Sequence, residues 1–186
     1  MKRLAKAVSL LFATAVLIPL LAFFAYDAIV FWPHRDQITA ILERSDPQDR
    51  RPPPSIERYI STLHSGDRPL ASVTSVVARQ LHTTFLPARK TMFNWHLRGV
   101  LWDRLISLHL SRNEVIGLYC TLSYNGEGQG MNALSERLFS KPLSDLSDQE
   151  AATVVAYISS PGFIGRNPER LATRRDKLLA GGKSWP

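Results

Sequence analysis

The residues best suited to bind an anion lie near the middle of the chain. Cationic side chains can hold a phosphate group, and Trp95 and Trp102 in the same stretch can lie against a lipid tail or a sugar face. The cationic residues of this group are Arg79, Arg89, Lys90, His96 and Arg98. They predict a site for a phosphorylated, partly apolar ligand. An exposed helix face with solvated charges is the alternative, and both interpretations stay open.

Two residues nearer the N-terminus can take up a proton. A histidine such as His64 has an ordinary pKa near neutrality, which suits a general base, although a single histidine in a helical region is more often structural. Glu57 stands at the start of a predicted helix, where a carboxylate is ordinarily a stabilising charge. Both are candidate catalytic residues, each with a structural alternative.

Motifs for metal binding and for nucleophilic catalysis are missing. The sequence has no CxxC, HExxH, GxSxG or phosphate-binding glycine loop, and its five histidines and one cysteine are scattered. We therefore predict no protein metal site. Cys120 has no partner for an internal disulfide, and we expect it to be buried.

The N-terminus predicts a membrane anchor. Ala7–Tyr26 contains no charged residue, and the apolar run continues to Trp32 with Asp27 as its single interruption. Lys2, Arg3 and Lys6 precede the run, so the positive-inside rule places the N-terminus in the cytoplasm and the rest in the periplasm. The protein is then a single-pass protein of the inner membrane. A cleaved signal peptide is the alternative, but the run is longer than a typical signal and lacks a clear cleavage site.

The formal net charge is +7, and +5 of it remains on the external part when Lys2, Arg3, Lys6 and Asp27 are left out. Such a basic surface suits anionic lipid headgroups or a phosphorylated substrate. A basic surface with no specific partner is the alternative. The periplasmic location argues against nucleic acid as a partner.

Apolar residues recur at helical spacing throughout the remaining chain, and no alternating strand pattern survives, so the fold class is all-α. Residues 34–46 predict a short helix and 47–54 an extended proline-rich linker. The predicted parts are a cytoplasmic tip and transmembrane anchor at 1–32, a juxtamembrane helix and linker at 33–54, and a periplasmic domain at 55–186.

Helix starts can be predicted at three places. Ser111 with Glu114, and Ser147 with Glu150, have the spacing of capping boxes. Asn167 before Pro168 predicts a third start. The sequence YNGEGQG at 124–130, with three glycines in seven residues, predicts a loop.

The order of three segments, SRNEVIGLY, YNGEGQGMNALSERLFSK and LSDLSDQEAATVVAYISSPGFIGRNPERLATRRD, resembles glycosyltransferase family 51, the peptidoglycan glycosyltransferases. The resemblance covers about 72–179. The residues that match are Ser111, Arg112, Glu114 and Tyr119 in the first segment; Gly126, Gly128, Gly130, Ala133, Phe139 and Lys141 in the second; and Asp145, Leu146, Glu150, Ala151, Ala152, Ala156, Pro161, Asn167, Pro168, Arg174 and Arg175 in the third.

This resemblance implies a lysozyme-like helical domain behind the anchor and polymerisation of lipid II, a lipid-linked glycan, as the reaction. A sugar hydroxyl attacks an anomeric carbon, and a lipid diphosphate leaves. Such chemistry needs a general base and cationic groups, often with a divalent metal, at the diphosphate. The resemblance also implies that Arg174 and Arg175 have a structural role in the fold, in which they pair with carboxylates and do not hold substrate.

Positions that the resemblance assigns to the reaction depart from the family pattern. His64 stands where the family has its base glutamate, and Gly99 where it has a second one. Ser75 and Gln80 keep part of a substrate-binding motif, in which Arg79 replaces a glutamine. The segment between His64 and Ser75 is shorter than in the family.

Two hypotheses follow: a glycosyltransferase with a rebuilt site, and a non-catalytic pseudoenzyme that binds lipid II or serves as a scaffold for cell-wall synthases. The predicted substrate-binding residues are Ser75, Arg79, Gln80, Arg89, Lys90, His96 and Arg98.

Overall fold

The computed structural model describes residues 2–64, 69–87, 91–164 and 167–181. These residues form helices and no strand, apart from one isolated antiparallel bridge between Tyr124 and Gln129. The all-α prediction is therefore confirmed. The chain divides into two compact units, Met1–Ile38 and Thr39–Pro186.

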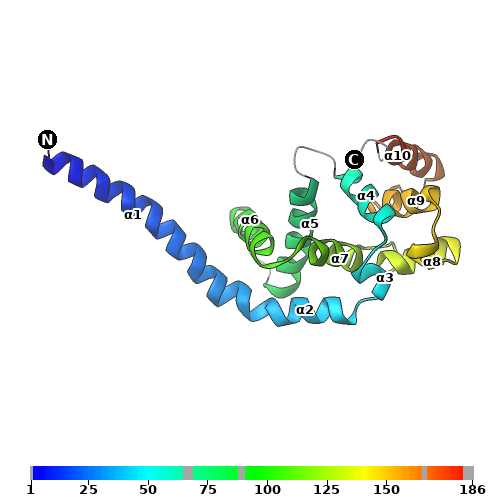
Figure 1. Cartoon of the computed structure of the whole chain (residues 1–186), viewed down its shortest axis with the longest axis horizontal. Helices are drawn as coiled ribbons and strands as arrows, with labels where there is room; N and C mark the ends of the chain where they lie inside the picture. Colours follow the sequence, from blue (N-terminus) through cyan, green and yellow to red (C-terminus); the bar gives the residue numbers. More distant parts are fainter. Residues whose placement is uncertain (1, 65–68, 88–90, 165–166, 182–186) are drawn as a thin grey trace. The chain divides into compact units, whose positions relative to one another are not determined.

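The first unit is a long N-terminal helix (Figure 1). Its elements are α1 (Lys2–Tyr26), a π-turn η1 (Asp27–Phe31), a 3-10 turn η2 (Trp32–His34) and the start of α2 (Arg35–Arg44). The helical run over Leu11–Arg44 is long and apolar enough to cross a membrane, and it is the one candidate of this kind in the described residues. Large apolar side chains between Leu11 and Phe24 are exposed, whereas Phe31, Ile38 and Leu42 further along the run are buried.

The second unit consists of short helices around a shared core (Figure 1). Its further elements are α3 (Pro47–Arg50), α4 (Pro54–Leu63), α5 (Pro69–Phe85), α6 (Met92–His109), α7 (Arg112–Leu122), α8 (Met131–Phe139), the turn η3 (Leu143–Asp145), α9 (Asp148–Ile158) and α10 (Pro168–Gly181). Helix α5 packs against α4, α6 and α7, and α9 packs against α4, α8 and α10.

Helix α7 is buried on nearly all sides, including Cys120 as predicted. Gly117 lies where the end of α3 meets α7, and a β-carbon there would stand 2.7 Å from the backbone oxygen of Arg50. The Arg50 oxygen belongs to the backbone and the β-carbon position is fixed by the helix, so neither can move aside cheaply. A glycine at this position lets the two segments approach.

The prediction of an extended linker at 47–54 is wrong. Asp46 caps α3 by accepting a hydrogen bond from the Gln48 amide at 2.7 Å, and Pro47 takes the first helical position, where its missing N–H costs nothing. Pro52 is buried, and α3 packs against α7. This segment is part of the compact unit that begins at Thr39. The domain start at Ser55 stays a prediction.

The predicted helix starts and the glycine loop are confirmed. Both capping boxes form, with the serine hydroxyls accepting from the glutamate amides and the carboxylates accepting in return. The side chain of Asn167 accepts from the Arg170 amide at 3.1 Å, and α10 begins at Pro168. Residues 124–130 form no helix.

A buried polar contact joins α3 to the start of α8. Asp49, 4% exposed, accepts a hydrogen bond from the Asn132 amide at 2.8 Å and thereby caps a helix 83 residues further on. The Asn132 side chain donates to Asp46 and Glu136, and its oxygen accepts from the Leu143 amide at 3.0 Å. We call this group the Asp49 junction: Asp46, Asp49, Gly130, Asn132 and Glu136.

Candidate functional site

Two clefts flank helix α5. The first, which we call the His64 cleft, has a volume of about 420 Å³ and lies among the end of α4, α5, α7, the end of α9 and α10. Its lining residues are Leu63, His64, Val76, Gln80, Tyr119, Ser123, Tyr124, Ile158, Ser159, Pro161 and Arg174. Among the described residues that line it are one arginine and no carboxylate. The cleft is therefore cationic, and polar groups from four helices converge on it.

His64 ends α4 and is held by Tyr119 of α7. Its Nε2 atom lies 3.0 Å from the Tyr119 hydroxyl, and the rings meet edge to face with centroids 5.4 Å apart. Burial lowers the pKa of His64, and the charge of Arg174 lowers it further. Burial also raises the pKa of Tyr119. At neutral pH both groups are therefore uncharged, and His64 has an imidazole that can accept a proton.

Two further side chains in this cleft have polar atoms without a protein partner. Gln80 donates to the Leu122 carbonyl at 3.3 Å, while its Oε1 atom is buried and accepts from no protein group. Arg174 has a buried Nε atom that donates to no protein group. Arg175 pairs with Asp176 at 2.8 Å as predicted, but Arg174 lines the cleft. The predicted structural role of Arg174 stays a prediction.

The second cleft, which we call the Arg79 cleft, has a volume of about 370 Å³ and lies between α5 and α6. Its lining residues are Ser75, Arg79, His82, Trp95, His96, Gly99, Val100, Asp103 and Arg104. Two guanidinium groups and one carboxylate line it. Asp103 accepts a hydrogen bond from the Ser75 hydroxyl at 2.7 Å, and this contact lies inside the cleft.

His82 was missed by the sequence reasoning. It is 2% exposed, its Nε2 atom has no protein partner, and its ring meets Trp95 edge to face at 5.7 Å. Burial lowers the pKa of His82, with Arg98 and Arg79 lowering it further. A signal was present, because His82 follows Ser75 by seven positions and Arg79 by three, which places all three on one face of a helix.

The predicted substrate-binding residues do not form one site. Ser75, Arg79 and His96 line the Arg79 cleft, whereas Gln80 lines the His64 cleft, because successive residues of a helix point about 100° apart. Arg98 lines neither cleft and donates to the Pro87 carbonyl at 2.9 Å. Arg89 and Lys90 lie outside the described residues.

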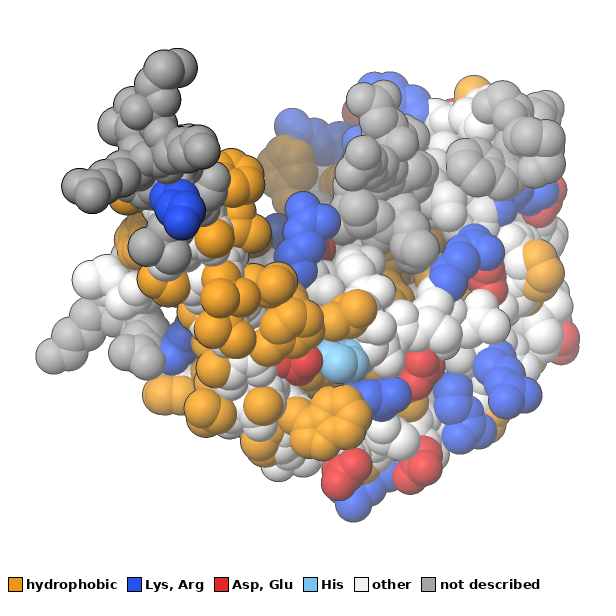
Figure 2. Space-filling view, turned by 60° about the vertical axis from the view of Figure 1, so that its left-hand side comes forward, with side chains coloured by type: hydrophobic (Ala, Val, Ile, Leu, Met, Phe, Trp, Pro, Cys, Tyr) orange, Lys and Arg blue, Asp and Glu red, His pale blue; other side chains and the backbone are white. Residues whose placement is uncertain are grey.

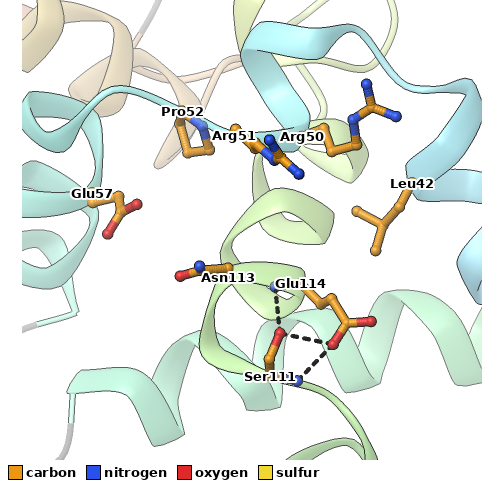
Figure 3. A pocket seen from close by; sticks show the side chains of 8 residues that line it. All are labelled: Leu42, Arg50, Arg51, Pro52, Glu57, Ser111, Asn113 and Glu114. Carbon is orange, nitrogen blue, oxygen red and sulfur yellow. Dashed lines mark hydrogen bonds between the residues drawn. The ribbon is translucent and has the colours of Figure 1, made fainter.

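Glu57, the second candidate base, lies in a third cavity of about 420 Å³ (Figure 3). This cavity is lined by Leu42, Arg50, Arg51, Pro52, Glu57, Ser111, Asn113 and Glu114. Glu57 pairs with Arg112 at 3.4 Å, and Glu114 is engaged in its capping box. The two candidate bases, seven residues apart on α4, therefore line different cavities.

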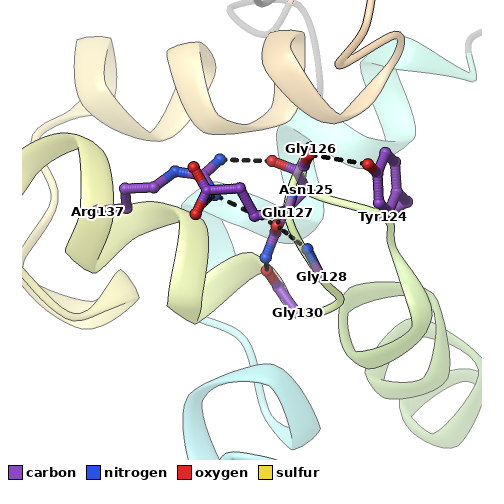
Figure 4. Close-up of polar contacts among 7 residues, drawn as sticks. All are labelled: Tyr124, Asn125, Gly126, Glu127, Gly128, Gly130 and Arg137. Atoms are coloured by element: carbon purple, nitrogen blue, oxygen red, sulfur yellow. Dashed lines mark hydrogen bonds and ion pairs between the residues drawn. The ribbon is translucent and has the colours of Figure 1, made fainter.

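The glycine loop is held by its own hydrogen bonds (Figure 4). The Asn125 side chain accepts from the amides of Glu127 and Gly128 and donates to the Gly130 carbonyl. Arg137 of α8 donates to the Asn125 carbonyl and pairs with Glu127 at 3.0 Å. Glu127 is thus an ion-pair partner of α8, although its side chain remains 75% exposed.

The described residues hold no group of three or more histidine, cysteine, aspartate or glutamate side chains placed to bind a metal ion. In the Arg79 cleft, Asp103 is the one carboxylate among the described lining residues. One carboxylate fits a magnesium ion that takes its other ligands from water and a substrate diphosphate.

Comparisons with known proteins agree with the motif order. The family model described as Transglycosylase matches residues 61–182. A biosynthetic peptidoglycan transglycosylase of Nitrosomonas eutropha (strain DSM 101675 / C91 / Nm57) is 28% identical over 117 residues, which cover 61% of this chain and 48% of the relative. The match thus spans about half the length of this curated relative.

Proposed function

Because this chain belongs to the transglycosylase family, we propose that its second unit binds a lipid-linked glycan, lipid II, in peptidoglycan biosynthesis. The family in general implies a substrate of this class. The glycan is assigned to the His64 cleft, and the diphosphate to the Arg79 cleft.

The set of unpartnered polar atoms in the His64 cleft carries this proposal. Sugar hydroxyls both donate and accept hydrogen bonds, so they can complement the Gln80 oxygen and the Arg174 Nε–H. Buried polar groups are normally satisfied, and two such atoms in one cleft are therefore best explained by a polar ligand. The ring of Tyr124 at the rim, 57% exposed, offers an apolar face for a sugar.

The Arg79 cleft suits a diphosphate because Arg79 and Arg104 add two permanent charges and His82 a further hydrogen-bonding nitrogen. A divalent metal ion, with Asp103 as one ligand, is compatible with this assignment. Of the predicted substrate-binding residues, Ser75, Arg79 and His96 keep that role here, and Gln80 keeps it in the His64 cleft. Arg98 is assigned no contact with the ligand.

For the location, we propose an inner-membrane protein with its N-terminus in the cytoplasm, 1–32 as the anchor, 33–54 as the juxtamembrane segment and 55–186 in the periplasm. The apolar N-terminal helix and the basic residues before it support this topology. If the protein is instead a non-catalytic scaffold, we propose cell-wall synthases as its partners.

Glycosyl transfer is the second candidate function, with His64 as the base. Its neutral imidazole can take the proton from an attacking sugar hydroxyl as the diphosphate leaves. The Tyr119 hydroxyl lies at the Nε2 atom, so the acceptor sugar would have to replace this contact. The described residues that line the cleft include no carboxylate in place of the family glutamate, and we therefore rank glycosyl transfer second to binding.

Binding of fluorescent lipid II to the full-length protein in detergent tests the proposal. Arg174→Gln should weaken binding roughly tenfold, since hydrogen bonds to charged groups contribute about 1.5–3 kcal/mol. Arg175→Gln is the matched control, because the neighbouring Arg175 pairs with Asp176 and should leave binding unchanged. Equal affinities of both variants and the wild type would refute the assignment to this cleft.

The same preparations, with and without Mg²⁺, should be assayed for glycan polymers. Polymers that disappear in His64→Ala but persist in Glu57→Ala would establish glycosyl transfer with His64 as the base. Binding without polymers is the expected result. If the protein neither binds lipid II nor forms polymers, the scaffold hypothesis remains. Co-purification with cell-wall synthases would then be the next measurement.

A further inference from the structure

The cavity that contains Glu57, which we call the Glu57 cavity, is lined by charges of both signs. Its volume of about 420 Å³ suits a small molecule. Arg50 ends α3, and Arg51 follows it directly. Glu57 and Glu114 stand in the first turns of α4 and α7. The two guanidinium groups and two carboxylates cancel, whereas cationic charge is in excess among the described lining residues of the clefts beside α5.

Arg51 and Glu57 are the opposite charges of this cavity that remain available. Glu114 is engaged in its capping box. The Oε2 atom of Glu57 lies 3.4 Å from Arg112, and its Oε1 atom has no hydrogen bond or ion pair to a described residue. Arg51 forms no ion pair with a described carboxylate, although Glu57 lines the same cavity. Figure 3 shows the Arg51 guanidinium and the Glu57 carboxylate apart from each other.

This arrangement differs from that of the surface charges. On the face in Figure 2, described acidic and basic side chains lie beside one another, and bulk water also solvates them. In the Glu57 cavity, the buried side chains of Leu42 and Pro52 contribute an apolar part of the lining. Charges interact more strongly where less water surrounds them. A ligand that contacts Arg51 and Glu57 together therefore forms two charge-assisted hydrogen bonds in a favourable setting.

We propose that the Glu57 cavity binds a small zwitterion, with its carboxylate at Arg51 and its ammonium group at Glu57. A short apolar chain between the two groups lies against Leu42 and Pro52. Amino acids and dipeptides have this chemistry. The Asn113 amide lines the same cavity and can donate to the carboxylate or accept from the ammonium group.

The charge balance of the cavity favours a neutral zwitterion over a simple anion. A ligand with no net charge matches a lining whose charges cancel. A phosphate ion at the arginines would instead face the carboxylates of Glu57 and Glu114, which repel it. The proposal does not depend on lipid II binding, because this cavity shares no lining residue with the His64 cleft or the Arg79 cleft.

The test is calorimetric titration of the full-length protein in detergent with β-alanine, γ-aminobutyrate and ε-aminohexanoate. These zwitterions differ in the separation of their charges, so one of them should bind best. Arg51→Gln and Glu57→Gln should each weaken its binding roughly tenfold, since each removes one charge-assisted hydrogen bond. No binding of any of the three, or equal affinities of the wild type and both variants, would overturn the proposal.

Two matched variants control for the loss of a charge. Arg44→Gln and Glu43→Gln remove the same charges from exposed residues of α2 that line neither this cavity nor the clefts, and they should bind like the wild type. An equal loss of affinity in these controls would show a non-specific charge effect and overturn the proposal. Denaturant unfolding of each variant confirms that it is folded.

Ligands with one charge test whether both groups are needed. Hexanoate and hexylamine match ε-aminohexanoate in chain length, and each should bind at least tenfold more weakly than the best zwitterion. Equal binding of either would overturn the proposal, as would tighter binding of phosphoethanolamine, which would indicate a phosphate site. Lipid II binding should stay unchanged in Arg51→Gln and Glu57→Gln, so failure of this proposal and failure of the proposed function are distinguishable.

Discussion

The Asp49 junction and the two clefts beside α5 differ in whether their buried polar atoms have hydrogen-bond partners. In the junction, Asp49 and Asn132 are almost fully buried, and the side chain of each has hydrogen-bond partners on other segments. In the clefts, Gln80, His82 and Arg174 each keep a buried atom without a protein partner. Because such atoms are costly, a satisfied network fits a structural role, whereas unsatisfied atoms that line a cleft are available to a ligand.

The sharpest test of this comparison replaces one amide in each region by leucine, which has a similar shape. Asn132→Leu removes bonds to two carboxylates and leaves the Leu143 amide unsatisfied, so we expect a loss of about 4 kcal/mol in the free energy of unfolding. Gln80→Leu removes one weak bond and an already unsatisfied oxygen, so stability should change little. Denaturant unfolding in detergent measures both, and equal losses would break the comparison.

A glycine of the junction should be nearly as sensitive. Gly130 has φ +102°, and a β-carbon there would lie 2.8 Å from the Asp49 Oδ2 atom, so Gly130→Ala adds backbone strain and a clash. We expect a loss of about 3 kcal/mol. Gly128→Ala in the same loop is the control, because no atom lies within 4 Å of its β-carbon position. Similar melting temperatures for both variants would contradict the prediction.

The junction should also make stability depend on pH. Burial raises the pKa of Asp49 from 3.8 to about 6, and the carboxylates of Asp46 and Glu136 add to the rise. The folded state thus holds the proton more tightly than the unfolded state. The resulting stabilisation is fully present below pH 3.8 and is lost as the pH rises through about 6, with a total of up to roughly 3 kcal/mol.

Asp49→Asn removes this titration while keeping an oxygen that can accept from the Asn132 amide. The variant should therefore gain stability relative to the wild type between pH 4 and pH 7. Denaturant unfolding of both proteins at a series of pH values measures the difference between their free energies of unfolding. The contributions of the other titrating groups cancel in this difference. A difference that stays constant with pH would show that Asp49 does not titrate in this range.

The smallest expected effect comes from a local cap. Ser147→Ala removes the hydroxyl that accepts from the Glu150 amide, and it should cost about 1 kcal/mol, as loss of an N-cap usually does. Lipid II binding should not change, since Ser147 lines neither cleft. A fall in affinity without a fall in stability would mean that the start of α9 belongs to the ligand site.

Local sequence determined much of this fold. The helical periodicity, both capping boxes, the start of α10 at Pro168 and the loop at 124–130 depend on contacts within a few residues, and all of them form. One local signal was misread: Asp46 before Pro47 begins a helix, although the prolines after it suggested an extended linker. Family membership could likewise be predicted, because motif order is a property of the sequence.

Tertiary structure alone decided which side chains share a cleft. Helix phase separates Gln80 from Ser75 and Arg79, and chain folding brings Arg174 of α10 to His64 of α4. The same holds for Asp49, which caps a helix 83 residues away and has its pKa raised by burial there. Spacing along the chain fixes contacts within a helix, but contacts between helices and the desolvation of a charge depend on the packing of the whole unit.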